Sequence, residues 1–434
     1  MRLVRTDRWL WPILCLALGV RLVAGVWWQA HLEPGQAFHF PDSESYWELA
    51  RTIAAGEPYR FGSPDRAVFR TPGFPLLLAP AFLVAGDDAS AMWGRAVTAV
   101  CGTFAVGGVY FWARHVLDAP AARVAAGLAA LYPGAVAMSG LVLTEAPFTA
   151  AIVWQLAVWH RGWVAGVERS GEPPGTRAGG SAAFRPQAPR EKSLPTPFHA
   201  LAVGVLGGVA TLIRPSWLLF TPAIAGLAVV IGRDKKRLAS FGLMATAALA
   251  LTMLPWWIRN WHVTGRFVPT TLQVGASLYD GLSPHADGSS DMTHAAEFAD
   301  RHGGGEYDLD RALRRAASTW AAAHPGEAVR LAGVKLTRMW NVWPNERSFR
   351  SWPARLIVAG SFVPVMLLAA IGAWRRRDRR CLLVLAVAPA VYLTALHVVF
   401  VSSIRYRQPA ILPLIVLAAG AAGALRQRRL DKRP

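Results

Sequence analysis

Cysteine is nearly absent from this chain of 434 residues. The three cysteines, Cys15, Cys101 and Cys381, all lie inside apolar runs. None has the spacing of a metal-ligand pair, and a thiol in apolar surroundings packs as a small hydrophobic group. The sequence therefore predicts neither a disulfide framework nor a cysteine-based metal centre.

Charged residues are also scarce, and acidic ones are the scarcer kind. They make up 17% of the chain, whereas 53% of the residues are hydrophobic. This composition indicates a membrane protein that crosses the bilayer several times. Lys and Arg outnumber Asp and Glu by 46 to 27. In a soluble protein that excess would suggest nucleic acid as a partner, but loops on the inner face of a membrane collect Lys and Arg for topological reasons.

Long hydrophobic runs dominate instead, and a spanning helix needs about 20 mainly apolar residues. The first run, Trp9–Trp28, follows Arg2, Arg5 and Arg8 and is predicted to be an uncleaved anchor, with a cleavable signal peptide as the alternative. The remaining candidate spans are Met92–Trp112, Ala121–Ser139, Leu141–Trp159, Phe198–Arg214, Ser216–Ile231, Leu238–Trp257, Trp352–Trp374, Leu382–Val401 and Pro409–Leu425.

The short apolar run Pro72–Ala85 decides the orientation. It has about 14 residues, a length more typical of an interfacial or re-entrant helix than of a span. If it stays on the outer face, ten spans remain and every dense basic cluster, including "RRRDRR" at Arg375–Arg380, falls on one side. The positive-inside rule then places both termini in the cytoplasm. The excess of positive charge is thereby explained without nucleic acid.

These assignments predict an all-α polytopic membrane protein in three parts. Residues 1–257 form an N-terminal transmembrane module with a first outer loop at 29–91, which carries juxtamembrane helices, and a disordered inner loop at 161–197 rich in Pro, Gly and Ser. Residues 258–351 form a small outer-face segment, in which "EYDLDRALRRAASTWAAAHP" predicts an amphipathic helix. Residues 352–434 form the last transmembrane helices and a basic inner tail.

Polar residues that could carry chemistry gather on the predicted outer side. Ionisable residues inside or beside apolar runs are functional candidates, because burying them is costly unless they are paired. The candidates are Asp42, Glu44, Tyr46, Arg60 and Arg70 in the first outer loop, Glu145 and Arg214 beside spans, and Arg259, Arg405 and Tyr406 at span ends.

A carboxylate among several arginines suits one kind of work. Guanidinium groups bind phosphate through charge-assisted, often bidentate hydrogen bonds. A carboxylate can take the proton from an attacking hydroxyl. At the outer edge of a bilayer, a natural substrate for this combination is a phosphate attached to a long lipid.

Six stretches, taken in order, resemble the membrane-embedded C-type (GT-C) glycosyltransferases. The resemblance is to the bacterial branch related to protein O-mannosyltransferases and to the aminoarabinose transferases of lipid A. The stretches are "DSESYWELARTIAAGEPY" with its Asp42-x-Glu44 pattern, "RTPGFPLLLAP", "LTEAPF", "LIRPSWLLFTP", "LPWWIRNWHVTGRFVPTT" and "IRYRQPAILPLIVLAAG".

The resemblance implies an inverting transfer of a sugar from a polyprenyl-phosphate donor to a lipid, glycan or protein acceptor, on the outer face of a bacterial inner membrane. It implies Asp42 as the general base, with Glu44 assisting it or binding the acceptor, and Arg70 near the donor phosphate. The other candidates are expected to bind substrate. The aminoarabinose branch has a lysine before two prolines where this chain has "RTPGFP", so that donor is not implied. No cofactor is implied; a divalent metal is possible but not required.

Alternative interpretations accompany these assignments. Asp42 or Ser43 is also well placed to cap a helix that begins in "PDSESYWELA". Arg21, inside the first span, is predicted to be structural, either reaching the interface or pairing with an acid. A transporter or flippase of lipid-linked glycans is the other functional class. Such a protein is expected to show inverted repeats and broken helices at the membrane midplane.

Overall fold

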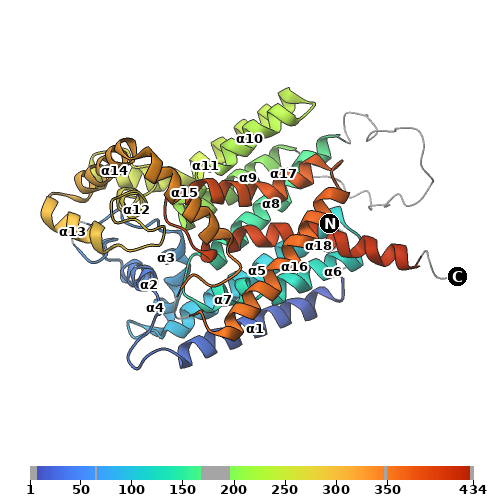
Figure 1. Ribbon diagram of the computed structural model, residues 1–434, viewed down its shortest axis with the longest axis horizontal. Helices are drawn as coiled ribbons and strands as arrows, with labels where there is room; N and C mark the ends of the chain where they lie inside the picture. Colours follow the sequence, from blue (N-terminus) through green and yellow to red (C-terminus); the bar gives the residue numbers. More distant parts are fainter. Residues whose placement is uncertain (1–6, 64–65, 168–195, 347–348, 431–434) are drawn as a thin grey trace.

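The computed structural model describes residues 7–63, 66–167, 196–346 and 349–430, and every regular element in this part of the chain is a helix. Long helices run side by side through the body of the molecule (Figure 1). Short helices gather at one end of it, on the left of the view.

The long apolar elements coincide with the ten predicted runs. They are α1 (Leu10–Ala30), α5 (Ala91–Val116), the pair α6 (Ala119–Leu131) and α7 (Pro133–Gly140), α8 (Glu145–Val167), α9 (Thr196–Ile213), α10 (Phe220–Ile231), α11 (Lys235–Thr264), α16 (Trp352–Arg375), α17 (Arg380–His397) and α18 (Ile404–Leu430). Five helices in the described part are long and apolar enough to cross a membrane, or six if α6 and α7 form one bent span. The chain is therefore a multi-pass membrane protein, while the number of ten spans stays a prediction.

The loop between α1 and α5, which the sequence predicted to lie on the outer face and to carry helices, contains three short helices. They are α2 (Pro41–Ala54), α3 (Gly73–Leu78) and α4 (Pro80–Ala85). Pro41 occupies the first turn of α2, where its missing N–H costs nothing. The run Pro72–Ala85 is divided into two helices of six residues each, and each is too short to cross a bilayer.

The break between α6 and α7 explains a charge buried inside the membrane region. Pro133 begins α7 and cannot donate a backbone hydrogen bond, and the two helices meet at an angle of 48°. Arg21 of α1 is fully buried, and its Nη1 and Nη2 donate to the carbonyl oxygens of Ala130 and Ala129, at 2.8 and 3.1 Å. Among the described residues the hydrogen-bond partners of Arg21 are main-chain carbonyls, so the predicted pairing with an acid is wrong.

Small residues let the long helices approach closely. A Cβ atom at Gly204 of α9 would collide with the carbonyl oxygen of Ala245 in α11, and one at Gly372 of α16 would collide with that of Leu417 in α18. Close backbone contact over small residues is a common way to pack helices where lipid removes the hydrophobic driving force.

Residues 266–346 form what we call the cap segment. It holds α12 (Val274–Gly281), α13 (Thr293–His302), α14 (Glu306–Ala323) and α15 (Pro325–Trp340). The predicted amphipathic helix is α14. Helix α11 continues to Thr264, beyond the boundary predicted at residue 257.

The cap segment is fastened to the connection between α17 and α18. The buried Lys335 donates from Nζ to the carbonyl oxygens of Gly281 and Val399, at 2.8 and 2.6 Å. The Ile404 N–H donates to Oδ1 of Asn345 at 2.8 Å. The start of α18 is therefore positioned by the cap segment.

The inner loop predicted at 161–197 is shorter than expected. Helix α8 continues to Val167 and α9 begins at Thr196, so both ends of the predicted loop are helical. The disorder predicted for the rest falls on residues 168–195, which lie outside the described residues.

Candidate active site

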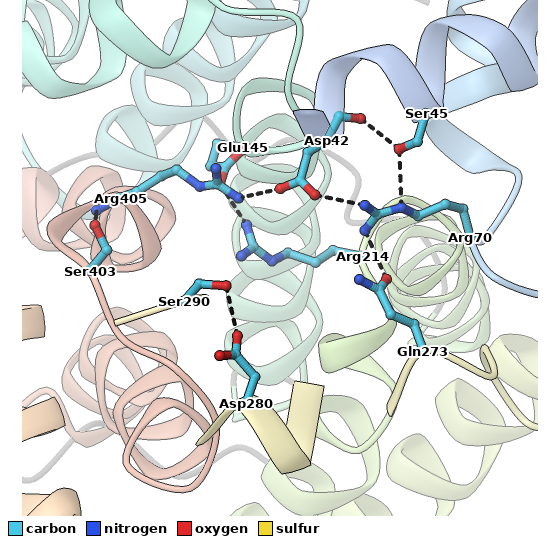
Figure 2. Close-up of polar contacts among 10 residues, drawn as sticks. All are labelled: Asp42, Ser45, Arg70, Glu145, Arg214, Gln273, Asp280, Ser290, Ser403 and Arg405. Atoms are coloured by element: carbon cyan, nitrogen blue, oxygen red, sulfur yellow. Dashed lines mark hydrogen bonds and ion pairs between the residues drawn. The ribbon is translucent and has the colours of Figure 1, made fainter. Parts of the chain in front are cut away.

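Asp42 lies in the first turn of α2 with its carboxylate between two arginines (Figure 2). Its Oδ1 accepts from Nη2 of Arg70 at 2.6 Å, and its Oδ2 accepts from Nη2 of Arg405 at 3.1 Å. The side chain remains 36% exposed. The N-cap position of α2 belongs to Phe40, and no described side chain caps this end. The capping interpretation of Asp42 is therefore wrong, because its oxygens face arginines and not the helix N–H groups.

Arg70 is held by three hydrogen bonds from three different nitrogens. Besides the bond to Asp42, Nη1 donates to Oε1 of Gln273 at 2.8 Å and Nε donates to Oγ of Ser45 at 3.2 Å. The guanidinium carbon lies 4.9 Å from the ring centroid of Tyr46, which packs beneath it. The planar guanidinium group of Arg70 is thus held in position by α2, through Asp42 and Ser45, and by the cap segment, through Gln273.

A second carboxylate, Glu145, extends this group of charged side chains into the helix bundle. We call Asp42, Glu145, Arg70, Arg214 and Arg405 together the cluster. Glu145 begins α8, after the non-helical residues that follow α7, and its side chain is fully buried. Its Oε1 lies 2.7 Å from Nε of Arg405 and 3.2 Å from Nη1 of Arg214. The partial positive charge of the α8 N-terminus adds to the stabilisation of this carboxylate. Arg405 therefore links the two acids.

The electrostatic balance of this cluster favours an anion. Burial by itself would raise the pKa of Asp42, but the charges of Arg70 and Arg405 outweigh burial and hold that pKa well below its usual range. Burial likewise opposes the charge of Arg70, and Tyr46 and Asp42 overcome it, so the pKa of Arg70 is raised. Three guanidinium groups face two carboxylates, which leaves one positive charge in excess.

Tyr406 is the remaining predicted residue at the cluster. The guanidinium carbons of Arg214 and Arg405 both lie 5.1 Å from its ring centroid. His397 stacks on the same ring with centroids 4.2 Å apart. The ring of Tyr406 thus makes favourable cation–π contacts with both arginines.

Three predicted residues lie apart from the cluster. Glu44 is exposed on α2, two residues after Asp42 and so on another face of the helix. Arg60 is exposed as well. Arg259 donates from Nη2 to the Tyr59 carbonyl oxygen at 3.1 Å and stacks on Tyr59 and Trp256. The Tyr59 hydroxyl in turn donates to the Arg70 carbonyl oxygen at 3.2 Å, so this tyrosine connects Arg259 to the site.

Two residues at the site had not been predicted, Ser45 and Gln273. Ser45 bonds both the Asp42 carbonyl oxygen, at 2.7 Å, and Arg70. Its position three residues after Asp42, one helical turn on, was a usable signal. Gln273 has no comparable signal, because it lies 203 residues from Arg70 in the chain. Within the described residues, no three His, Cys, Asp or Glu side chains gather as metal ligands.

Comparison with known proteins gives matches at the level of structure. No family model matches the chain, and no curated protein matches it by sequence. The oligosaccharyltransferase AglB of Archaeoglobus fulgidus, solved with an inhibitory peptide and a dolichol-phosphate, aligns with a TM-score of 0.59 and 16% identity, over 98% of this chain and 51% of that one. The apo form of the Archaeoglobus oligosaccharyltransferase aligns with a TM-score of 0.58 and 17% identity, over 98% and 52%.

The chain has the GT-C fold. It spans about half the length of the oligosaccharyltransferases that it resembles. ArnT of Cupriavidus metallidurans, bound to undecaprenyl phosphate, also aligns over 96% of this chain and 78% of that one, with 16% identity and a TM-score of 0.44. The two oligosaccharyltransferase alignments confirm the predicted GT-C architecture.

Proposed function

We propose that this protein is a glycosyltransferase that moves a sugar from a polyprenyl-phosphate donor to an acceptor on the outer face of a bacterial inner membrane. One observation carries the proposal: the Asp42 carboxylate lies between Arg70 and Arg405. Helix α2, which carries Asp42, is among the short helices at one end of the molecule (Figure 1). The GT-C fold and the multi-pass architecture support it.

In this mechanism the donor phosphate binds the arginines beside Asp42. An acceptor hydroxyl attacks the anomeric carbon from the face opposite the phosphate, so the configuration inverts. Asp42 accepts the hydroxyl proton as the new bond to the anomeric carbon forms, and the bond between that carbon and the phosphate oxygen breaks. A positioned general base of this kind contributes about 10²–10⁴-fold.

The charge of the cluster supports a donor with one phosphate group. The phosphodiester of a polyprenyl-phosphate sugar carries one negative charge, which matches the single excess positive charge of the cluster. A diphosphate donor carries more negative charge than these residues balance. Arg259, one tyrosine away from Arg70, is placed to contribute to binding at the edge of this site. The acceptor is a lipid, a glycan or a protein.

Transfer by purified protein in lipid vesicles tests this proposal. Vesicles containing polyprenyl-phosphate sugars are mixed with an envelope extract from a strain that lacks the gene, and release of free polyprenyl phosphate is followed. We expect Asp42→Asn to fold and bind donor but to lose transfer by about 100-fold or more. Glu48→Gln is the matched control, since Glu48 is an exposed acid on the same helix and should transfer normally.

Two results would contradict the proposal. Normal transfer by Asp42→Asn would remove Asp42 as the base. Movement of the lipid-linked sugar across the vesicle membrane without release of polyprenyl phosphate would indicate a flippase instead.

A further inference from the structure

The arginine nitrogens that hold Asp42 are the donors best placed to hold a phosphate. Asp42 engages Nη2 of Arg70 and Nη2 of Arg405, one with each oxygen. The Nη1 and Nε groups of Arg70 are already bonded to Gln273 and Ser45, and Nε of Arg405 faces Glu145. An anion that bridges Nη2 of Arg70 and Nη2 of Arg405 therefore competes with the carboxylate for both donors.

In the proposed reaction the leaving phosphate gains one negative charge while the Asp42 carboxylate loses one. The donor phosphodiester carries one negative charge, and breaking its bond to the sugar leaves a phosphate monoester with two. In the same step the proton of the acceptor hydroxyl passes to Asp42 and neutralises its carboxylate. The net charge of the five cluster side chains therefore rises from one to two positive charges. This gain matches the one negative charge that the phosphate gains.

We propose that the leaving phosphate replaces Asp42 on the same pair of arginines during transfer. The carboxylate releases Arg70 and Arg405 as it takes up the proton, and the phosphate binds them in its place. This inference rests on the proposed function and adds a second role for Asp42. The ionised carboxylate excludes a doubly charged phosphate from the arginines before reaction. After the proton has left for solvent, the same carboxylate helps to expel the product.

Binding of two lipids to the donor-free protein tests the exchange without any turnover. Undecaprenyl phosphate, a monoester, represents the product, and its methyl diester carries the single charge of the donor. Asn in place of Asp42 resembles the protonated acid, which leaves the arginines to the phosphate. At pH 8 we expect Asp42→Asn to raise the preference for monoester over diester by at least about tenfold relative to the unchanged protein.

The exposed control separates this effect from general electrostatics. Glu48→Gln removes one negative charge from the same helix without touching the described arginines of the cluster. It should leave the preference for monoester over diester within about twofold of that of the unchanged protein.

Proton uptake on binding gives a second, independent measure. The groups around Asp42 are Arg70, Arg405 and Tyr46, with Glu145 and Arg214 beyond them. Of these, the carboxylate and the bound phosphate are the coupled pair, and two adjacent anions retain a shared proton. Calorimetry at pH 7 in two buffers of different ionisation enthalpy should show proton uptake approaching one for the unchanged protein and markedly less for Asp42→Asn.

The outcomes distinguish the exchange from the function on which it rests. If Asp42→Asn loses transfer but neither its monoester preference nor its proton uptake changes, the exchange is wrong and the general base stands. If Asp42→Asn transfers normally, the base is wrong. If the unchanged protein binds neither lipid, the proposed donor class is wrong as well. If Asp42→Asn proves too unstable to purify, proton uptake by the unchanged protein decides alone, and its absence would refute the exchange.

Discussion

Replacing Glu145 with glutamine should destabilise the protein more than any exchange of an exposed acid. Glutamine keeps the size of the side chain, so no cavity forms and the change is mainly the loss of one negative charge. Oε1 of Glu145 lies within 2.7 Å of Arg405 and 3.2 Å of Arg214, and the carboxylate is fully buried. After the substitution, two guanidinium groups that are only 13% and 18% exposed face each other without their shared anion.

The size of the effect follows from the burial of these groups. Removing one partner of a buried ion pair typically costs about 3–5 kcal/mol, because the remaining charge is left uncompensated. The exposed pair Arg330–Glu327, at 2.6 Å but with both side chains more than half exposed, provides the comparison. Such surface pairs contribute about 0–1 kcal/mol, because water and salt screen them. We therefore expect Glu145→Gln to lower the free energy of unfolding by several kcal/mol and Glu327→Gln by less than about 1 kcal/mol.

Reversible unfolding in mixed detergent micelles measures both variants. A double variant, Glu145→Gln with Arg214→Met, adds an internal check, because removing one orphaned cation should recover part of the loss. Equal stability of Glu145→Gln and Glu327→Gln would refute the reasoning and would mean that Glu145 does not hold α8 to α18.

Two further predictions concern the donor phosphate and the orientation. Arg70→Lys should weaken binding of undecaprenyl phosphate by at least about tenfold, because one ammonium nitrogen cannot occupy the three positions from which Nε, Nη1 and Nη2 bond Ser45, Gln273 and Asp42. Binding as tight as that of the unchanged protein would contradict the role of the planar guanidinium. In a background without the three native cysteines, a cysteine at Asp300 should react with an impermeant thiol reagent in intact cells, and one at Lys236 should react only after permeabilisation; the reverse pattern would overturn the predicted orientation.

The helices of this protein could be predicted from the sequence because hydropathy is a local signal. Each of the ten predicted apolar runs coincides with a helix or with the bent pair α6–α7, and the amphipathic stretch is α14. The length of Pro72–Ala85 was also informative, since both of its helices are short. The end of α8 was misplaced, because the apolar run ends before the helix does.

The partners of the charged residues were harder to predict from the sequence. "IRYRQP" contains two arginines, and the sequence does not say which one faces the acids. Residues two apart in a helix point to different sides. Arg405 meets Asp42 and Glu145, whereas Arg407 donates to the carbonyl oxygens of Met339 and Asn341, at 3.0 and 2.6 Å. The same limit applies to Asp42 and Glu44, of which only the first faces the arginines.

The cap segment explains why the arrangement around Asp42 depends on contacts distant in sequence. It bonds one of the two arginines directly, through Gln273 on Arg70. It positions the other indirectly, because Asn345 binds the N–H of Ile404, the residue just before Arg405, and Lys335 binds the carbonyl oxygen of Val399. Any movement of the cap segment relative to α18 would therefore change the separation of the two guanidinium groups that hold Asp42. A carboxylate and a phosphate that bind the same arginines in turn need that separation to be fixed, and the cap segment contributes to fixing it on both sides.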